Sequence, residues 1–119
     1  MAHPVVVVDD ESDLLDVLRD CLEEEGFAVF GMPDSENLIG LPLGTMPDLF
    51  VLDLMLPGRT GFELARHLRR TGFADTPMIA MSASPEVLQD AARSGLFQET
   101  IGKPFDLQEL IDVMHGLLD

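Results

Sequence analysis

Short apolar runs alternate along the 119-residue chain with segments of helical periodicity. The runs at residues 5–8 and 49–52 are continuous, which is typical of strands buried on both faces of a parallel sheet. Three further apolar runs, some of them short and weak, bring the number of predicted strands to five. The five predicted strands cover residues 5–8, 27–31, 49–52, 77–81 and 99–102.

Helix start and stop signals lie between these strands. Ser12 and Gly26 stand where an N-cap and a terminating glycine would bound a first helix. Thr60-Gly61-Phe62-Glu63 has the form of a capping box, and Ser84-Pro85 is a cap followed by a proline at the first helical position. The helices predicted after the first cover residues 35–39, 61–70, 85–94 and 107–118.

Strand and helix therefore alternate five times with short connections. This order predicts a parallel sheet with helices on both faces and right-handed crossovers. A chain of 119 residues has room for one domain, which we expect to span residues 1–119, and a hydrophobic fraction of 46% is enough for one core.

Charge and composition narrow the classes of function. Seven Lys and Arg against 22 Asp and Glu give a formal net charge of −15, which argues against nucleic-acid binding by this domain. The single cysteine excludes an internal disulfide and fits a reducing compartment. No apolar run is long enough to span a membrane. We therefore expect a cytoplasmic protein without a membrane partner.

Chemically active side chains follow the predicted strands. Because parallel strands end at the same edge of a sheet, these side chains should share one crevice. Three clustered carboxylates repel one another unless a cation joins them, and hard oxygen ligands favour Mg²⁺, with Mn²⁺ as the alternative ion. The residues concerned are Asp9, Asp10, Asp53, Ser82 and Lys103.

The same crevice suits phosphoryl transfer. Lys103, the only lysine of the chain, could reach an anion across the crevice, and Ser82 could donate a hydrogen bond to it. With a metal ion, these groups would support phosphoryl transfer to the carboxylate of Asp53.

Five fragments in the same order carry a family resemblance. They are Val7-Val8-Asp9-Asp10-Glu11, Pro47-Asp48 with Leu52-Asp53-Leu54-Met55-Leu56-Pro57-Gly58, Gly61, Met81-Ser82-Ala83 and Lys103-Pro104-Phe105. On these fragments the sequence resembles the receiver domains of response regulators in two-component signal transduction, of the chemotaxis-regulator kind. The resemblance implies a single α/β domain, doubly wound (βα)₅ and flavodoxin-like, with a parallel sheet in the order 2-1-3-4-5.

The resemblance also implies roles for individual residues. Asp53 would accept a phosphoryl group from the phosphohistidine of a sensor histidine kinase or a histidine phosphotransfer protein, or from a small acyl phosphate. Asp10, Asp53 and the backbone carbonyl of Met55 would bind Mg²⁺ directly, and Asp9 would act through metal-bound water. Lys103 would pair with the phosphoryl oxygens, and Ser82 would swing toward them.

One position departs from the family pattern. Receivers usually carry an aromatic residue three positions before the lysine, where its ring couples to the serine or threonine movement, and here that position is Thr100. Phe97 lies nearby but does not fit the register. We therefore expect Ser82 to carry the switch, with the contribution of position 100 open.

Three functions are consistent with these sequence features. The leading one is a phosphorylation-dependent signalling switch that phosphorylates and dephosphorylates itself but turns over no external substrate. A receiver-like interaction module that works without phosphorylation is the main alternative. A phosphatase with an aspartyl-phosphate intermediate is a third, but such enzymes typically place an acid where Met55 stands.

The expected partners follow from the leading function. They are a histidine kinase or histidine phosphotransfer protein and a downstream protein that the sequence does not name. We expect a monomer or a weak, phosphorylation-dependent dimer. The arginines at positions 66, 69 and 70 are interpreted as a solvated helix face.

Overall fold

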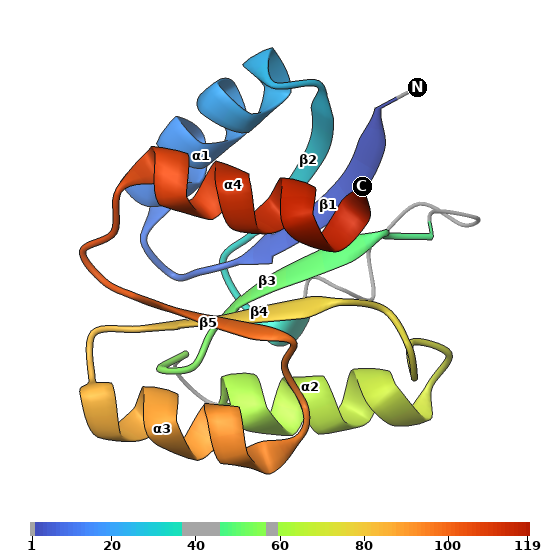
Figure 1. Ribbon diagram of the computed structural model, residues 1–119, viewed down its shortest axis with the longest axis vertical. Helices are drawn as coiled ribbons and strands as arrows, with labels where there is room; N and C mark the ends of the chain where they lie inside the picture. The colour runs from blue at the N-terminus through green and yellow to red at the C-terminus, as the bar shows by residue number, and fades with distance from the viewer. Residues whose placement is uncertain (1, 37–45, 57–59) are drawn as a thin grey trace.

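The computed structural model describes residues 2–36, 46–56 and 60–119. Its centre is a sheet of five parallel strands in the order β2-β1-β3-β4-β5 (Figure 1). The elements are β1 (His3–Val8), α1 (Ser12–Glu24), β2 (Phe27–Met32), β3 (Leu49–Asp53), α2 (Gly61–Arg70), β4 (Met78–Ser82), α3 (Pro85–Ser94), β5 (Glu99–Gly102) and α4 (Leu107–Leu118). The predicted flavodoxin-like α/β fold and its strand order are confirmed.

Two layers of helices cover the sheet. α1 and α4 pack on one face, and α2 and α3 pack on the other (Figure 1). Alternate residues of the central strands supply the two cores: Val5 and Val7 face the first layer, whereas Val6 and Val8 face the second. Both faces of these strands are therefore buried from solvent, which explains why their sequences are continuous apolar runs.

Helix boundaries follow local sequence signals in most cases. In α2, the Thr60 side chain accepts a hydrogen bond from the Glu63 N–H, and the Glu63 side chain accepts one from the Thr60 N–H, so the predicted capping box is formed. α3 starts after the cap Ser84 and ends before Gly95, which has a left-handed φ of 76°. Both predicted helices are confirmed.

The start of α1 differs from the prediction. Ser12 is the first helical residue rather than the N-cap, and Glu11 occupies the cap position without a side-chain cap. The reason lies one turn earlier, where Asp9 Oδ1 accepts a hydrogen bond from the Glu11 N–H at 2.9 Å and fixes the entry to the helix. The helix predicted over residues 35–39 lies mostly outside the described residues.

Strand register brings the carboxyl ends of the strands to one edge of the sheet. Asp53 pairs with Met81, and Ser82 pairs with Gly102. The Lys103 N–H then donates to the Ser82 carbonyl oxygen at 2.9 Å, which extends the β4–β5 pairing by one residue. None of the described helices is long and apolar enough to cross a lipid bilayer.

Candidate functional site

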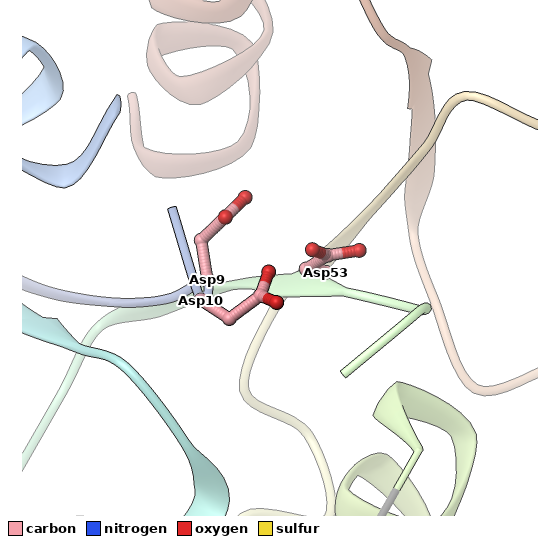
Figure 2. A group of neighbouring side chains, drawn as sticks. All are labelled: Asp9, Asp10 and Asp53. Atoms are coloured by element: carbon pink, nitrogen blue, oxygen red, sulfur yellow. The ribbon is translucent and has the colours of Figure 1, made fainter. Parts of the chain in front are cut away.

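Three carboxylates meet at this edge of the sheet. Asp9 and Asp10 directly follow β1, and Asp53 is the last residue of β3 (Figure 2). One carboxylate oxygen from each lies within 4.8 Å of the others. Asp9 is fully buried and Asp53 is 4% exposed, whereas Asp10 is exposed. The predicted acidic cluster is therefore formed, with two acids fixed in the protein and one open to solvent.

Both oxygens of each buried acid have partners. Asp9 Oδ1 accepts from the Glu11 N–H, and its Oδ2 accepts from Lys103 Nζ at 2.6 Å. Asp53 Oδ1 accepts from the Met55 N–H at 2.9 Å, and its Oδ2 lies 3.4 Å from Lys103 Nζ. Among the described residues, the Asp10 side chain has no hydrogen-bond partner. Asp10 is thus the acid most available to a cation.

Lys103 enters the cluster from the end of β5. Its side chain is 15% exposed, and the carboxylate of Glu11 lies 3.8 Å from Nζ on the solvent side. Burial by itself lowers the pKa of this ammonium, but the hydrogen bond to Asp9 and the nearby carboxylates outweigh it, so the pKa lies above its ordinary 10.5. Lys103 is therefore a fixed cation at neutral pH.

Ser82 lies beside Lys103 at the end of β4. It is only 1% exposed, and its Oγ accepts a hydrogen bond from the Ser84 N–H at 3.1 Å. Ser84 is in turn the N-cap of α3, because its Oγ accepts from the Val87 N–H. The Ser82 hydroxyl is thus hydrogen-bonded to the N-cap residue of α3.

The turn after β3 is built around Gly61. Its N–H donates to the Leu54 carbonyl oxygen at 3.4 Å. A Cβ at this position would overlap the main-chain oxygen of Asp53 and lie 2.8 Å from Leu54 Cα, so only glycine allows this approach. The side chain of Met55 is 61% exposed, on the solvent side of the same turn. α2 therefore begins directly against the residue that ends β3.

The residue at position 100 is a threonine, so it brings no aromatic ring to the site. Thr100 lies in β5, pairs with Ala80 and is half-buried. Phe97 is buried and packs edge-on against the ring of Phe62 in α2, with ring centroids 6.0 Å apart. Phe97, the aromatic residue nearest to position 100 in sequence, is thus part of the core beneath α2 and α3.

Sequence reasoning missed two contacts. Glu11 is the third carboxylate around Lys103, after Asp9 and Asp53, and its place in the run that follows β1 was the available signal. Arg69 is not part of a solvated face, because its guanidinium donates to main-chain carbonyl groups of two loops. Backbone acceptors leave no mark in the sequence, so no pattern could have identified this contact.

Comparison with known proteins places this geometry in context. The family model of the response regulator receiver domain matches residues 5–115. The response regulator TrrA from Thermotoga maritima, solved in complex with Mg(2+)-BeF, is 28% identical with a TM-score of 0.85, and the match covers 98% of this chain and 99% of that one. Chemotaxis protein CheY4 of Vibrio cholerae, 23% identical with a TM-score of 0.87 over 99% of this chain and 100% of that one, shares the fold.

A third match is to part of a longer protein. NtrX from Brucella abortus, solved in complex with ATP, is 29% identical with a TM-score of 0.88. The match covers 99% of this chain and 27% of that one.

Proposed function

The chain belongs to the response regulator receiver family, and we propose that it acts as a signalling switch in which Asp53 accepts a phosphoryl group. The observation that supports this most strongly is the cluster itself. Three carboxylates lie with their oxygens within 4.8 Å of one another, and a single ammonium is held at 2.6 Å from one and 3.4 Å from another.

The donor set fits a hard divalent cation. Carboxylate oxygens are the ligands that Mg²⁺ prefers, and Mn²⁺ is the alternative ion. Of the three carboxylates, that of Asp10 is exposed and so accessible to an ion from solution. In this proposal Asp10, Asp53 and the backbone carbonyl of Met55 bind the ion directly, and Asp9 contributes through water. The bound ion would neutralise negative charge on the phosphoryl group. The response regulator TrrA, solved in complex with Mg(2+)-BeF, supports Mg²⁺ as the ion proposed.

Asp53 acts as the nucleophile. One of its carboxylate oxygens attacks phosphorus, and the bond from phosphorus to the donor breaks. A phosphohistidine donor releases imidazole, which takes up a proton, and an acyl phosphate releases a carboxylate. The hydrogen bond from the Met55 N–H orients the Asp53 carboxylate for this step. Later attack of water on phosphorus releases inorganic phosphate and restores Asp53.

Lys103 and Ser82 respond to the new charge. Lys103 Nζ is already within 3.4 Å of Asp53 Oδ2, so it can pair with the phosphoryl oxygens after a small movement. Ser82 would donate its hydroxyl proton to the same group. Because Ser82 Oγ accepts from the Ser84 N–H, such a movement would act on the start of α3. Thr100 would then take no more than a minor part in the switch.

The partners follow from this chemistry. The phosphoryl donor would be a sensor histidine kinase or a histidine phosphotransfer protein, and the output a change in binding to a downstream protein in the cytoplasm. No external substrate is turned over, and neither nucleic acid nor membrane is a partner of this domain. Self-association, if any, would be a weak dimer that depends on phosphorylation.

One observation favours the alternative of an interaction module that is never phosphorylated. Position 100 is a threonine, so an aromatic ring that reports on the site is absent there. The alternative predicts that Mg²⁺ binds but that no phosphoryl group is accepted. The complete set of acids, lysine and serine at the strand ends weighs against it.

Intact mass spectrometry after incubation with acetyl phosphate tests the proposal. We expect one phosphoryl adduct in the wild type with Mg²⁺, none without Mg²⁺ and none in Asp53→Asn. Asp16→Asn, which changes an exposed acid on α1, is the matched control and should form the adduct normally. A folded wild type that binds Mg²⁺ but forms no adduct would support the interaction module instead.

A further inference from the structure

The guanidinium group of Arg69, near the end of α2, joins two loops at the edge of the sheet where β4 and β5 begin. This edge is opposite to the one that carries the acidic cluster. Nη1 lies within hydrogen-bond distance of three carbonyl oxygens in the loop that leads to β4, so at least one of its two N–H groups is shared between two acceptors. Nε and Nη2 donate to one carbonyl oxygen in the loop between α3 and β5. The acceptors are Phe73 (2.9 Å), Ala74 (3.1 Å) and Thr76 (2.6 Å) in the first loop and Leu96 (3.2 Å from Nε) in the second.

Gln98 extends this network into the sheet. Arg69 Nη2 donates to Gln98 Oε1 at 3.0 Å, and the same oxygen accepts from the N–H of Met78, the first residue of β4, at 2.7 Å. The N–H of Gln98 donates to the Met78 carbonyl oxygen at 2.9 Å. Gln98 is therefore bound to β4 through both its main chain and its side chain, one residue before β5 begins.

The few interactions within β5 itself do little to determine its register against β4, so contacts from outside the strand matter. β5 is four residues long, lies at an edge of the sheet and buries only Ile101. A parallel edge strand with one buried side chain has a weakly specified register. Its far end leads to Lys103, whose N–H bonds the Ser82 carbonyl and whose Nζ reaches Asp9. A displacement of β5 along β4 would therefore move Lys103 out of the acidic cluster.

We propose that Arg69, acting through Gln98, is a positioning residue for Lys103. The contact between Arg69 and Gln98 sets the start of β5 against β4, and the strand transmits that register to the lysine at its other end. Arginine suits this position because its five N–H donors, fixed in one plane, reach acceptors on two loops, whereas a lysine offers a single ammonium. The kinetic consequence rests on the proposed function, whereas the structural consequence does not.

Hydrogen exchange measured by NMR tests the structural part without phosphorylation. In Arg69→Met we expect the amides of both Gln98 and Lys103 to exchange at least about tenfold faster than in the wild type. Arg70→Met is the matched control, because this neighbouring arginine is exposed and has no hydrogen bond to the described residues. Faster exchange confined to Gln98, or no change at all, would overturn the proposal.

A double-mutant cycle tests the kinetic part. The rate of phosphorylation by acetyl phosphate should fall about threefold to tenfold in Arg69→Met, and the same change made in Lys103→Ala should have no further effect. Equal losses in both backgrounds would mean that Arg69 acts other than through Lys103, and would overturn the proposal. A wild type that takes up no phosphoryl group would refute the proposed function, while the exchange measurement would still decide the role of Arg69.

A milder variant covers the case in which Arg69→Met does not fold. Gln98→Ala removes the bridge to β5 and leaves the carbonyl contacts of Arg69 in place. It should reproduce the faster exchange at Lys103 and the loss of rate, whereas Gln89→Ala, an exposed glutamine in α3, should change neither. Normal exchange at Lys103 in Gln98→Ala would overturn the proposal.

Discussion

The Lys103 ammonium donates to Asp9 Oδ2 at 2.6 Å, across 94 positions of the chain. Asp9 is fully buried, so this ion pair satisfies a carboxylate that water cannot reach. The lysine lies nearer to Asp9 than to Asp53, whose Oδ2 is 3.4 Å away. In this structure Lys103 is therefore paired mainly with Asp9, and under the proposed function it would shift toward Asp53 to meet a phosphoryl group.

Replacing Lys103 should have opposite effects on folding and on metal binding. Lys103→Met leaves the buried Asp9 without its cation and should cost about 3 kcal/mol in the free energy of unfolding when no metal is present. Removing a positive charge from the cluster should also tighten Mg²⁺ binding severalfold. Denaturant unfolding and calorimetric titration measure the two effects. Weaker Mg²⁺ binding in this variant would contradict the arrangement.

The same ion pair predicts a loss of stability in alkali. The pKa of Lys103 is raised above 10.5 in the folded protein, so the stabilisation it gives is complete below its unfolded pKa and is lost as pH rises through the folded value. The stability difference between the wild type and Lys103→Met should therefore stay constant up to about pH 10 and shrink as pH rises above 10.5. A difference that also stays constant above pH 10.5 would show that the ion pair does not stabilise the fold.

Asp10 should matter for the metal and little for the fold. Its side chain is exposed and has no hydrogen-bond partner among the described residues, so Asp10→Asn removes charge without breaking a contact. We expect Mg²⁺ affinity to fall at least about tenfold and stability to stay the same or rise slightly, because repulsion among the acids is relieved. Unchanged affinity in calorimetric titration would exclude Asp10 as a ligand.

Gly61 should be intolerant of a side chain. The Cβ of Gly61→Ala would overlap the main chain at Asp53 and force the turn to move, at a cost of about 1–3 kcal/mol together with slower phosphorylation. Gly116→Ala in α4 is the matched control, because among the described residues no atom beyond the neighbouring backbone of its own helix lies within 4 Å of the position that its Cβ would take, and it should stabilise by up to about 1 kcal/mol. Thermal unfolding compares the two, and equal behaviour would disprove the close approach.

Met55 should influence the lifetime of the phosphorylated state. The Met55 side chain is exposed, and the N–H of the same residue donates to Asp53 Oδ1. A thioether is a poor group for positioning water by hydrogen bonding. We expect slow to intermediate dephosphorylation in the wild type and faster loss of the phosphoryl group in Met55→Asn. The decay of the adduct mass after removal of acetyl phosphate measures this, and an unchanged rate would refute the idea.

Much of the fold was predictable because burial on both faces and end signals leave a direct trace in the sequence. The run of four valines at residues 5–8 feeds two cores in alternation, and the cap Ser84 with the stop Gly95 bounds α3 at the predicted residues. The same logic predicted that Asp9, Asp10 and Asp53 would converge, since Asp53 ends one strand, Asp9 and Asp10 follow another, and both strands end at one edge of the sheet.

The remainder depends on contacts that have no sequence signature. Ser12 looks like an N-cap, but the turn that Asp9 forms with the Glu11 N–H determines where α1 begins. Arg69 has the pattern of a surface arginine, yet its acceptors are carbonyl groups brought together only by the tertiary fold. Main-chain acceptors are the same for every residue type, and periodicity therefore cannot reveal them.

The most direct test of the account is to locate the phosphoryl group by peptide mapping. Borohydride reduction of an aspartyl phosphate converts that side chain to the alcohol of homoserine, which tandem mass spectrometry places at one position. After treatment with acetyl phosphate and Mg²⁺, we predict homoserine at position 53 and aspartate at positions 9 and 10. Homoserine at position 9 or 10, or aspartate retained at all three, would contradict the assignment of Asp53 as the acceptor.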